Sequence, residues 1–434
     1  MSTQRHDTRL DRFVDSYADR TNGMRASAVR ALFAVANRPE IVSLAGGMPN
    51  IKDLALDVIA DNMARLIRDH GAQIMQYGSG QGELRIREKI LDVMALEGIT
   101  AHPDDIVITA GSQQGLDLVT RVFCDPGDVI LAESPSYVGA LGTFLSYQTE
   151  VVHVASDDEG IDPAALRDTI VRLKSEGKRV KFLYTIPNFS NPSGLTQSQA
   201  RRREVVDVCN AGDVMVVEDN PYGLLTLEGE PQPAMRATDP DVIYLGSFSK
   251  IFAPGFRVGW VLAPHGVREK LVLAQESATL CPPVFSQFAI ADYLEHYDWR
   301  GQIVTYRHMY RGRRDAMLEE LSERMPHGVS WTHPAGGFFV WLTLPDGLDA
   351  QAMLPRGVNA RVAYVPGAAF YADGQGSNNI RLSFCFPPAD RIREGVQRLA
   401  SVIEGELEVQ EIFGTRTTRP SRLHGPSVSP DLAS

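Results

Sequence analysis

Cysteine and long apolar runs are both scarce in this sequence. Its 434 residues include four cysteines, which are far apart and show no Cys-x-x-Cys spacing. They are Cys124, Cys209, Cys281 and Cys385. This distribution indicates neither a disulfide framework nor a zinc site, so we interpret the four as buried thiols and expect no metal. No stretch approaches the ~18 apolar residues of a membrane span, and residues 1–7 lack the apolar core of a signal peptide. We therefore expect a cytoplasmic protein without membrane contact.

Positive charge is also in short supply. The chain has 43 Lys and Arg against 54 Asp and Glu, which gives a formal net charge of −11, and it has no long run of basic residues. A phosphate backbone selects clustered basic side chains, so the composition argues against a nucleic-acid partner and favours a small molecule. Arginine supplies most of the positive charge, which makes individual lysines conspicuous. The lysines are Lys52, Lys89, Lys174, Lys178, Lys181, Lys250 and Lys270.

Short apolar runs alternate with helical patterns over the middle of the chain. The runs lie at 105–109, 129–132, 151–154, 182–186, 214–217, 242–245 and 258–261. Strands that are separated by helices form α/β domains with largely parallel sheets. The sequence therefore predicts an α/β large domain with a mostly parallel, seven-stranded sheet.

The C-terminal part has a different pattern. Residues 286–325 have helical periodicity, and they are followed by strand-like runs and an amphipathic helix. These later segments lie at 338–342, 363–365, 380–384 and 390–404. Together they predict a smaller α+β domain. The end of the chain is rich in Thr, Arg, Pro and Ser, so it has too few apolar residues to order itself. The expected divisions are an N-terminal arm with a helix at 27–36 (1–50), a large domain (51–285), a small domain (286–411) and a disordered tail (412–434).

Lys250 is the lysine in the most suggestive setting. It ends the segment 246–250, which follows a predicted buried strand and contains Ser247, and Arg257 comes seven positions later. Such a lysine suits an aldehyde cofactor, because the amine can form a Schiff base while the hydroxyls and the guanidinium hold a phosphate. A surface lysine in a turn is an equally good interpretation of this segment alone.

Asp219 follows another predicted buried strand, 214–217, and Tyr222 comes three residues later. Ligands of open α/β sheets bind at the carboxyl ends of strands, where a carboxylate can pair with a pyridinium nitrogen and keep it protonated. An isolated aspartate at such a place is more often a helix cap. The neighbourhood favours the pyridine partner, because Lys250 lies one strand later and Tyr222 can reach the same ring.

Two further residues lie where they could contact a cofactor ring. Asn191 stands in an Asn-Pro-Ser-Gly turn directly after the strand 182–186, and its amide can donate to a phenolate oxygen. Turns of this kind are common, so the motif on its own is weak evidence for a contact with a cofactor. Tyr137 lies where an aromatic ring can stack on a cofactor, although a lone tyrosine is more often simply half-buried.

The segment from Gly111 to Gln113 joins the strand 105–109 to a helix that we expect to begin near Ser112. Backbone N–H groups at a helix N-terminus attract anions, because they lack partners within the helix and the helix dipole is positive there. Gly111 would permit a close approach of the ligand. The segment therefore predicts a phosphate cradle.

These motifs follow one another in a recognisable order. They are Ser-Leu-Ala-Gly-Gly-Met-Pro at 43–49, Tyr77-Gly-x-Gly-x-Gly82, Gly111-Ser-Gln-Gln, Asn191-Pro-Ser-Gly, Asp219-x-x-Tyr222, Ser247-x-Ser-Lys250 and Arg381. In this order, they resemble the fold-type I, class I/II aminotransferases, which use pyridoxal 5′-phosphate, and most closely the 2-aminoadipate/kynurenine branch. The resemblance runs from about residue 26 to residue 403.

The resemblance implies roles around the cofactor. Lys250 would bind its aldehyde and shuttle the 1,3-proton, and Asp219 would pair with the pyridine nitrogen as a second catalytic residue. Tyr222, the third, would reach the ring oxygen together with Asn191, and Tyr137 would stack on the ring. The cofactor phosphate would be bound by Gly111, Ser112, Gln113, Ser247 and Arg257.

The resemblance also implies how substrates bind. The planar guanidinium of Arg381 would clamp the α-carboxylate, next to Asn191 and Gly47. Tyr77 would reach into the site of a neighbouring subunit, which implies a homodimer. Arg30, on the expected N-terminal helix, would face a distal carboxylate, but a solvated helix arginine is a slightly better interpretation of that position.

The implied reaction is a ping-pong exchange of an amino group between an α-amino acid and a 2-oxo acid. Substrates like 2-aminoadipate or glutamate, aromatic amino acids, branched-chain amino acids and arylglycines all remain open.

The main alternative is a pyridoxal-phosphate-dependent lyase, decarboxylase or oxidase with the same fold. A transcription regulator of this fold would need a basic winged-helix domain before residue 43, and only about forty residues precede it. A nicotinamide dehydrogenase is disfavoured, because no Gly-x-Gly-x-x-Gly joins a strand to a helix.

Overall fold

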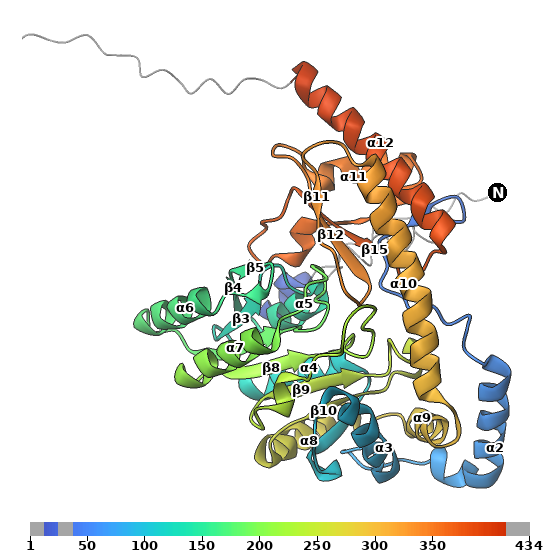
Figure 1. The fold of residues 1–434 in the computed structure, drawn as a ribbon. Coiled ribbons are helices and arrows are strands. Elements are labelled where there is room, and N and C mark those ends of the chain that lie inside the picture. Colours follow the sequence, from blue (N-terminus) through green and yellow to red (C-terminus); the bar gives the residue numbers. More distant parts are fainter. Residues whose placement is uncertain (1–12, 25–37, 414–434) are drawn as a thin grey trace, which may run out of the picture.

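The computed structural model describes residues 13–24 and 38–413 (Figure 1). The helix expected at 27–36, with Arg30, lies outside the described residues, as does the expected tail from residue 414 onward. Within the described part, no helix combines the length and the apolar composition that a membrane crossing requires.

A seven-stranded sheet is the centre of the large domain (Figure 1). Its strands, in spatial order, are β2 (Ile106–Thr109), β10 (Gly259–Leu262), β9 (Ile243–Ser247), β8 (Met215–Asp219), β7 (Val180–Thr185), β3 (Val129–Glu133) and β4 (Glu150–Val154). β10 runs antiparallel to both of its neighbours, and the other pairs are parallel. The predicted α/β fold with a mostly parallel seven-stranded sheet is confirmed.

Helices cover both faces of this sheet (Figure 1). They include α4 (Ser112–Phe123), α5 (Val138–Ser146), α6 (Pro163–Ser175), α7 (Gln199–Ala211) and α8 (His265–Thr279). Because successive strand residues point to opposite faces, Leu183 of β7 packs with α6 and α7. Its neighbours Phe182 and Tyr184 belong to the cluster on the other side, with Phe144 of α5. Both faces are therefore apolar, as the continuous apolar runs require.

The small domain is built on a four-stranded sheet (Figure 1). Its strands, in order, are β11 (Ser330–Trp331), β12 (Phe339–Thr343), β15 (Asn379–Ser383) and β14 (Val365–Pro366). α10 (Trp299–Arg324), α11 (Ala350–Asn359) and α12 (Ala389–Phe413) belong to this part, whereas α9 (Val284–His296) packs against the helices at 56–74 and 84–94. α12 continues past the predicted helix end at 404 and includes the start of the expected tail, residues 412 and 413.

The helical stretch predicted at 286–325 is two helices rather than one. α9 and α10 are separated at Tyr297 and Asp298. Asp298 caps the second helix, because its Oδ1 accepts a hydrogen bond from the Gly301 backbone N–H at 2.9 Å. A capping aspartate favours a new helix start over continuation of the old one.

Several elements outside the two larger sheets complete the fold. α2 (Leu56–Ile74) and α3 (Leu84–Met94) pack against α9. β1 (Val42–Ser43) pairs in parallel with β13 (Val362–Ala363), and β5 (Ser156–Asp157) forms a hairpin with β6 (Gly160–Ile161). The β1–β13 pair attaches the segment that begins at residue 38 to the small domain.

The four cysteines are all unpaired thiols. Cys124, Cys209 and Cys385 are buried as predicted, whereas Cys281 is half-buried, so the prediction was wrong for this residue. Cys281 lies in the short connection between α8 and α9, where the chain passes close to the surface. A connection at the surface leaves a small side chain partly exposed.

Candidate active site

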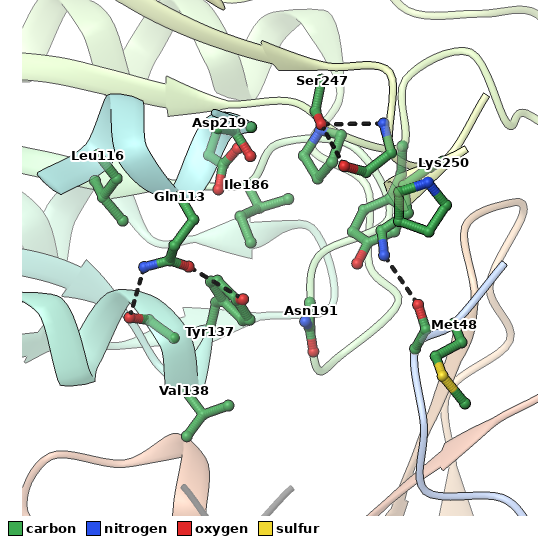
Figure 2. A pocket seen from close by; sticks show the side chains of 18 of the residues that line it. Met48, Gln113, Leu116, Tyr137, Val138, Ile186, Asn191, Asp219, Ser247 and Lys250 are labelled. Atoms are coloured by element: carbon green, nitrogen blue, oxygen red, sulfur yellow. Dashed lines mark hydrogen bonds between the residues drawn. The ribbon is translucent and has the colours of Figure 1, made fainter. Parts of the chain in front are cut away.

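A cavity of about 430 Å³ lies at the carboxyl ends of β7, β8 and β9 (Figure 2). Residues from the large domain and from the small-domain strands β12 and β15 line it together. The lining includes every predicted site residue that the structure describes, except Tyr77. These are Gly47, Gly111, Ser112, Gln113, Tyr137, Asn191, Asp219, Tyr222, Ser247, Lys250, Arg257 and Arg381. The fold thus brings together side chains from segments that are far apart in the sequence.

Lys250 follows β9 and points into this cavity (Figure 2). Its Nζ donates a hydrogen bond to the Gly47 carbonyl oxygen at 2.9 Å. Burial lowers the pKa of the Lys250 ammonium, because a charged amine loses hydration there, and the neighbouring guanidinium of Arg381 lowers it further. A lysine with a lowered pKa more readily supplies the neutral amine that attacks an aldehyde.

Asp219 ends β8, and its side chain is only 5% exposed. Its Oδ2 accepts a hydrogen bond from the Tyr184 hydroxyl at 2.7 Å. Its Oδ1 is buried and has no hydrogen-bond partner among the residues that the structure describes. Burial raises the pKa of the Asp219 carboxyl to about 6. A buried carboxylate oxygen without a donor, on the wall of a cavity, suits a cationic N–H group such as a protonated pyridine nitrogen.

The start of α4 supplies an anion-binding corner of the cavity. Gly111 is the N-cap of this helix with φ 83° and ψ 164°, and Ser112 is its first residue. Arg257 lies across from it and donates from Nη2 to the Ala110 carbonyl oxygen at 2.7 Å. The Ser247 hydroxyl, which bonds the Ser249 hydroxyl at 2.9 Å, faces the same cavity. Helix N–H groups, hydroxyls and a guanidinium converge here, which suits a phosphate group.

Gly111 cannot be replaced without disturbing this corner. A Cβ at Gly111 would lie 2.6 Å from Arg257 Nη2, and its backbone angles are those that essentially only glycine adopts. We expect Gly111→Ala to weaken cofactor binding at least about tenfold, because the added Cβ displaces the Arg257 guanidinium, and a loss of ~1.4 kcal/mol of its interaction with the phosphate corresponds to that factor. Titration of the apoenzyme with pyridoxal phosphate measures the effect.

Gly127→Ala is the matched control for this prediction. Gly127 has nearly the same φ, 84°, but a Cβ there would meet nothing within 4 Å, and the residue does not line the cavity. It should cost stability without changing the dissociation constant of the cofactor. Equal affinities of the two variants would show that the Gly111 corner does not hold the phosphate.

Arg381 lies in the middle of β15, between Trp341 of β12 and Val365 of β14. Only 2% of its surface is exposed, and burial lowers the pKa of its guanidinium to about 10. Its Nη1 donates to Asn191 Oδ1 at 2.8 Å and its Nη2 to the Ala45 carbonyl oxygen at 2.6 Å. The guanidinium is therefore held in place before any ligand arrives, and it still carries a net positive charge at neutral pH.

The bond from Arg381 also fixes the orientation of the Asn191 amide. Because Asn191 Oδ1 accepts from the guanidinium, Asn191 Nδ2 is left as the donor toward the cavity. This orientation fits the prediction that Asn191 donates to a phenolate oxygen. Tyr222 lies nearby with its ring packed edge-on against Phe338 and Phe339.

The segment from Ala45 to Met48 forms one wall of the cavity and joins the two domains. The Gly47 carbonyl accepts from Lys250, and the Ala45 carbonyl accepts from Arg381. The Cys385 thiol, just after β15, donates to the Met48 carbonyl oxygen at 3.1 Å. The sequence interpretation assigned Cys385 no role beyond burial, because the Met48 carbonyl that it contacts lies far away in the chain.

Tyr137 and Gln113 share the wall opposite Lys250 (Figure 2). The Tyr137 hydroxyl donates to Gln113 Oε1 at 3.3 Å, and Gln113 Nε2 donates to the Thr143 hydroxyl at 2.7 Å. The Gln113 side chain is thereby engaged with protein groups, so its backbone N–H is the group that remains for a phosphate. The fixed Tyr137 ring borders the same cavity as Asp219 and Ser247.

One predicted site residue that the structure describes is not in the cavity. Tyr77 is 77% exposed, in the segment between α2 and α3. Arg30 lies outside the described residues. The sequence interpretation also missed lining residues, because most of them have apolar side chains that carry no chemical signal of their own. These are Met48, Leu116, Val138, Gly139, Ile186, Pro221, Ser249, Pro254 and Phe339.

Comparison with known proteins identifies the family of this chain. Residues 40–399 match the family model of aminotransferase class I and II, so the chain belongs to that family. The aromatic-amino-acid aminotransferase 1 of Thermococcus litoralis is 43% identical over 90% of this chain and 95% of its own length.

Two solved structures are similar as well. The kynurenine aminotransferase of Pyrococcus horikoshii, in complex with PMP, has a TM-score of 0.87 at 42% identity and covers 92% of this chain and 99% of its own. The α-aminoadipate aminotransferase of Thermus thermophilus, complexed with N-(5′-phosphopyridoxyl)-L-leucine, has a TM-score of 0.84 at 34% identity and covers 91% and 99%. The chain is thus a fold-type I aminotransferase of the 2-aminoadipate/kynurenine branch, and its cofactor is pyridoxal phosphate.

Proposed function

We propose that this aminotransferase moves the amino group of an aromatic amino acid to a 2-oxo acid by ping-pong exchange. The observation that carries this proposal is the apolar part of the cavity lining. It consists of Met48, Leu116, Val138, Ile186 and Phe339. Apolar and aromatic walls stabilise an apolar side chain by removing it from water, and they leave a carboxylate without partners.

The cations of the cavity support the same substrate class. Among the described lining residues, the cationic side chains are Lys250, Arg257 and Arg381. Lys250 is suited to binding the cofactor aldehyde, Arg257 to binding the cofactor phosphate and Arg381 to binding the substrate α-carboxylate. The described lining residues therefore offer no further cation for a distal carboxylate of the substrate. The Thermococcus litoralis relative is named for aromatic amino acids, which is consistent with this assignment.

We further propose that the residues act on the cofactor and substrate as follows. When bound, pyridoxal phosphate supplies an aldehyde that condenses with amines and a ring that accepts electrons. Asp219 holds a proton at the ring nitrogen, while Tyr222 and Asn191 Nδ2 donate toward the ring oxygen. The phosphate is bound by the N-terminus of α4 with Ser112 and the Gln113 backbone, and by Ser247 and Arg257.

Lys250 is the residue that moves the substrate proton. With cofactor and substrate bound, its Nζ would take the proton from the substrate Cα, and burial, which lowers the pKa of Lys250, favours the neutral amine that such a base requires. Arg381 binds the α-carboxylate and so fixes the position of Cα relative to Lys250. Tyr137 covers one face of the ring and limits the access of water.

A half-reaction screen tests the substrate class. The holoenzyme is mixed with phenylalanine, kynurenine, 2-aminoadipate, glutamate, leucine and phenylglycine, and the conversion of the cofactor to its amine form is followed by absorbance. We expect fast conversion by the aromatic amino acids, and recovery after a 2-oxo acid is added. Faster conversion by 2-aminoadipate would favour a distal carboxylate site, and ammonia release without recovery would favour the lyase or oxidase alternative.

Arg381→Ala is expected to raise KM for every amino acid about 100-fold, because removing one partner of a buried charged hydrogen-bonded pair costs a few kcal/mol. Steady-state kinetics with several substrates measure this. Arg314→Ala is the control, because Arg314 is also a buried arginine but does not line the cavity. An increase in KM for one substrate alone would mean that Arg381 recognises the side chain instead.

We also propose that two chains form a dimer in which Tyr77 reaches the partner's site. Tyr77 is exposed, yet the loop that follows it is fixed, because Gln275 Nε2 donates to the Gly80 carbonyl oxygen at 2.5 Å. A large aromatic side chain on a fixed loop suits a protein contact. Analytical ultracentrifugation should give twice the 47.7 kDa of one chain, and a monomer with full activity would contradict the proposal.

A further inference from the structure

Tyr184 is a buried tyrosine next to the site that the sequence interpretation did not single out. It lies in β7 and is fully buried. Its hydroxyl donates to Asp219 Oδ2 at 2.7 Å. The other carboxylate oxygen, Oδ1, is the buried atom that has no partner among the described residues. One oxygen of Asp219 is thus held by the protein, and the other is left for a ligand.

The sheet fixes this pair. Tyr184 is opposite Val217 in the parallel pairing of β7 and β8, and Asp219 lies two residues after Val217 on the same face. Phe144 of α5 packs edge-on against the Tyr184 ring, with 5.5 Å between the ring centroids and an interplanar angle of 76°. A hydroxyl on an aromatic ring that is packed on a strand has little freedom, so it constrains the plane of the Asp219 carboxylate.

The Tyr184 hydroxyl is important because other groups around Asp219 raise the pKa of its carboxyl. Burial raises the pKa of the Asp219 carboxyl most, and Glu218 raises it further, whereas the Tyr184 hydroxyl and Lys250 lower it. The ionisable groups that act electrostatically with Asp219 lie on several elements. They are Glu133, Tyr137, Tyr184, Glu218, Tyr222 and Lys250. Burial also raises the pKa of Tyr184 well above its usual value, so its hydroxyl stays a donor at every working pH.

We propose that Tyr184 is a positioning residue that keeps Asp219 ionised and turned with Oδ1 toward the cofactor ring nitrogen. Its hydroxyl stabilises the charged carboxylate by a hydrogen bond that a neutral carboxyl would accept less strongly. In the pair formed by Oδ1 and the ring nitrogen, the proton is therefore held on the nitrogen. The inference rests on the proposed function, in which Asp219 faces that nitrogen.

The test uses holoenzyme loaded with pyridoxal phosphate that carries ¹⁵N in the ring, since the ¹⁵N resonance reports whether that nitrogen is protonated. Tyr184→Phe keeps the ring and its contact with Phe144 but removes the hydroxyl. We expect the resonance to move toward that of the unprotonated nitrogen. We also expect kcat to fall about tenfold or more with little change in KM, because a hydrogen bond to a charged group is worth about that factor.

Tyr364→Phe is the matched control. Tyr364 is a buried tyrosine of the small domain whose hydroxyl donates to the Ala350 carbonyl oxygen at 2.9 Å, and it does not line the cavity. This variant also loses a buried hydroxyl and its hydrogen bond. It should lose stability but keep the wild-type ¹⁵N resonance and kcat. If Tyr184→Phe behaves in the same way as Tyr364→Phe, Tyr184 has only a structural role and the inference is overturned.

A third variant separates this inference from the proposed function. Asp219→Asn should also move the ring nitrogen toward its unprotonated resonance. If Asp219→Asn leaves the resonance unchanged, Asp219 does not face the ring nitrogen and the proposed function fails at this residue. If Asp219→Asn moves it and Tyr184→Phe does not, the proposed role of Asp219 stands and the role of Tyr184 is wrong.

Discussion

Replacing Lys250 with alanine is expected to lower the rate of transamination at least about 10⁴-fold, because one change removes both the covalent anchor and the base. The structure supports this size of effect, since the Lys250 Nζ is the amine that lines the cavity and its pKa is lowered by burial. The absorbance of the lysine-bound cofactor should disappear as well. Steady-state kinetics and visible spectra of the purified variant measure both effects.

Lys270→Ala is the control for this prediction. Lys270 is an exposed lysine of α8 that does not line the cavity, so its loss should change neither rate nor spectrum. Borohydride treatment adds a chemical readout, because reduction makes the bond between lysine and cofactor permanent. The reduced cofactor should be found on the peptide that contains Lys250. A cofactor that is still fixed covalently by borohydride in Lys250→Ala would rule out the assignment.

Asp219→Asn is expected to damage activity and yet stabilise the apoenzyme at alkaline pH. The rate should fall about 10³-fold, because an amide does not hold a proton on the ring nitrogen. The effect on stability follows from the pKa of Asp219, which burial raises from 3.8 to about 6. A raised carboxyl pKa means that the folded apoenzyme loses stability as pH rises from about 4 through 6, by about 3 kcal/mol in total.

The amide has no charge to bury, so it avoids this loss. At pH 8, the apoenzyme of Asp219→Asn should therefore unfold at a higher temperature than the wild type. At pH 4, most of this difference should be gone, because this pH is close to the unfolded-state pKa of 3.8, where the loss of stability has only begun, and the wild-type carboxyl is still protonated in the folded state. Thermal unfolding of both apoenzymes at the two pH values measures this difference in unfolding temperature. A temperature difference that is the same at pH 4 and pH 8 would mean that the carboxylate is not destabilising in the folded state.

Much of the large domain could be predicted from the sequence because its strands are continuous apolar runs. Buried parallel strands need apolar residues on both faces, so the seven runs stood out, and the site motifs follow directly after them. Ser112 at the start of α4 and Asp219 at the end of β8 are examples. In both cases, a local pattern determines where the side chain lies.

Contacts between distant segments could not be predicted in this way. Tyr184 resembles any other apolar strand residue, and only the register of β7 against β8 brings its hydroxyl to Asp219. The pairing of β1 with β13 likewise depends on the complete small domain. The break between α9 and α10 was missed because the apolar periodicity continues across Tyr297 and Asp298, while the cap that divides the helices is a single polar side chain.

The segment from Ala45 to Met48 also has a consequence for biosynthesis. Its carbonyl groups accept hydrogen bonds from Lys250, which is 203 residues from Gly47, and from Arg381, which is 336 residues from Ala45. Domains usually fold as their residues leave the ribosome, and contacts between distant residues form late. A nascent chain that ends before Arg381 can assemble the seven-stranded sheet. It lacks Arg381, however, which is one of the hydrogen-bond donors to the segment from Ala45 to Met48. The part of the site that is translated early must therefore wait for residues that are translated near the end, so the ability to bind the substrate α-carboxylate is acquired only when synthesis is almost complete.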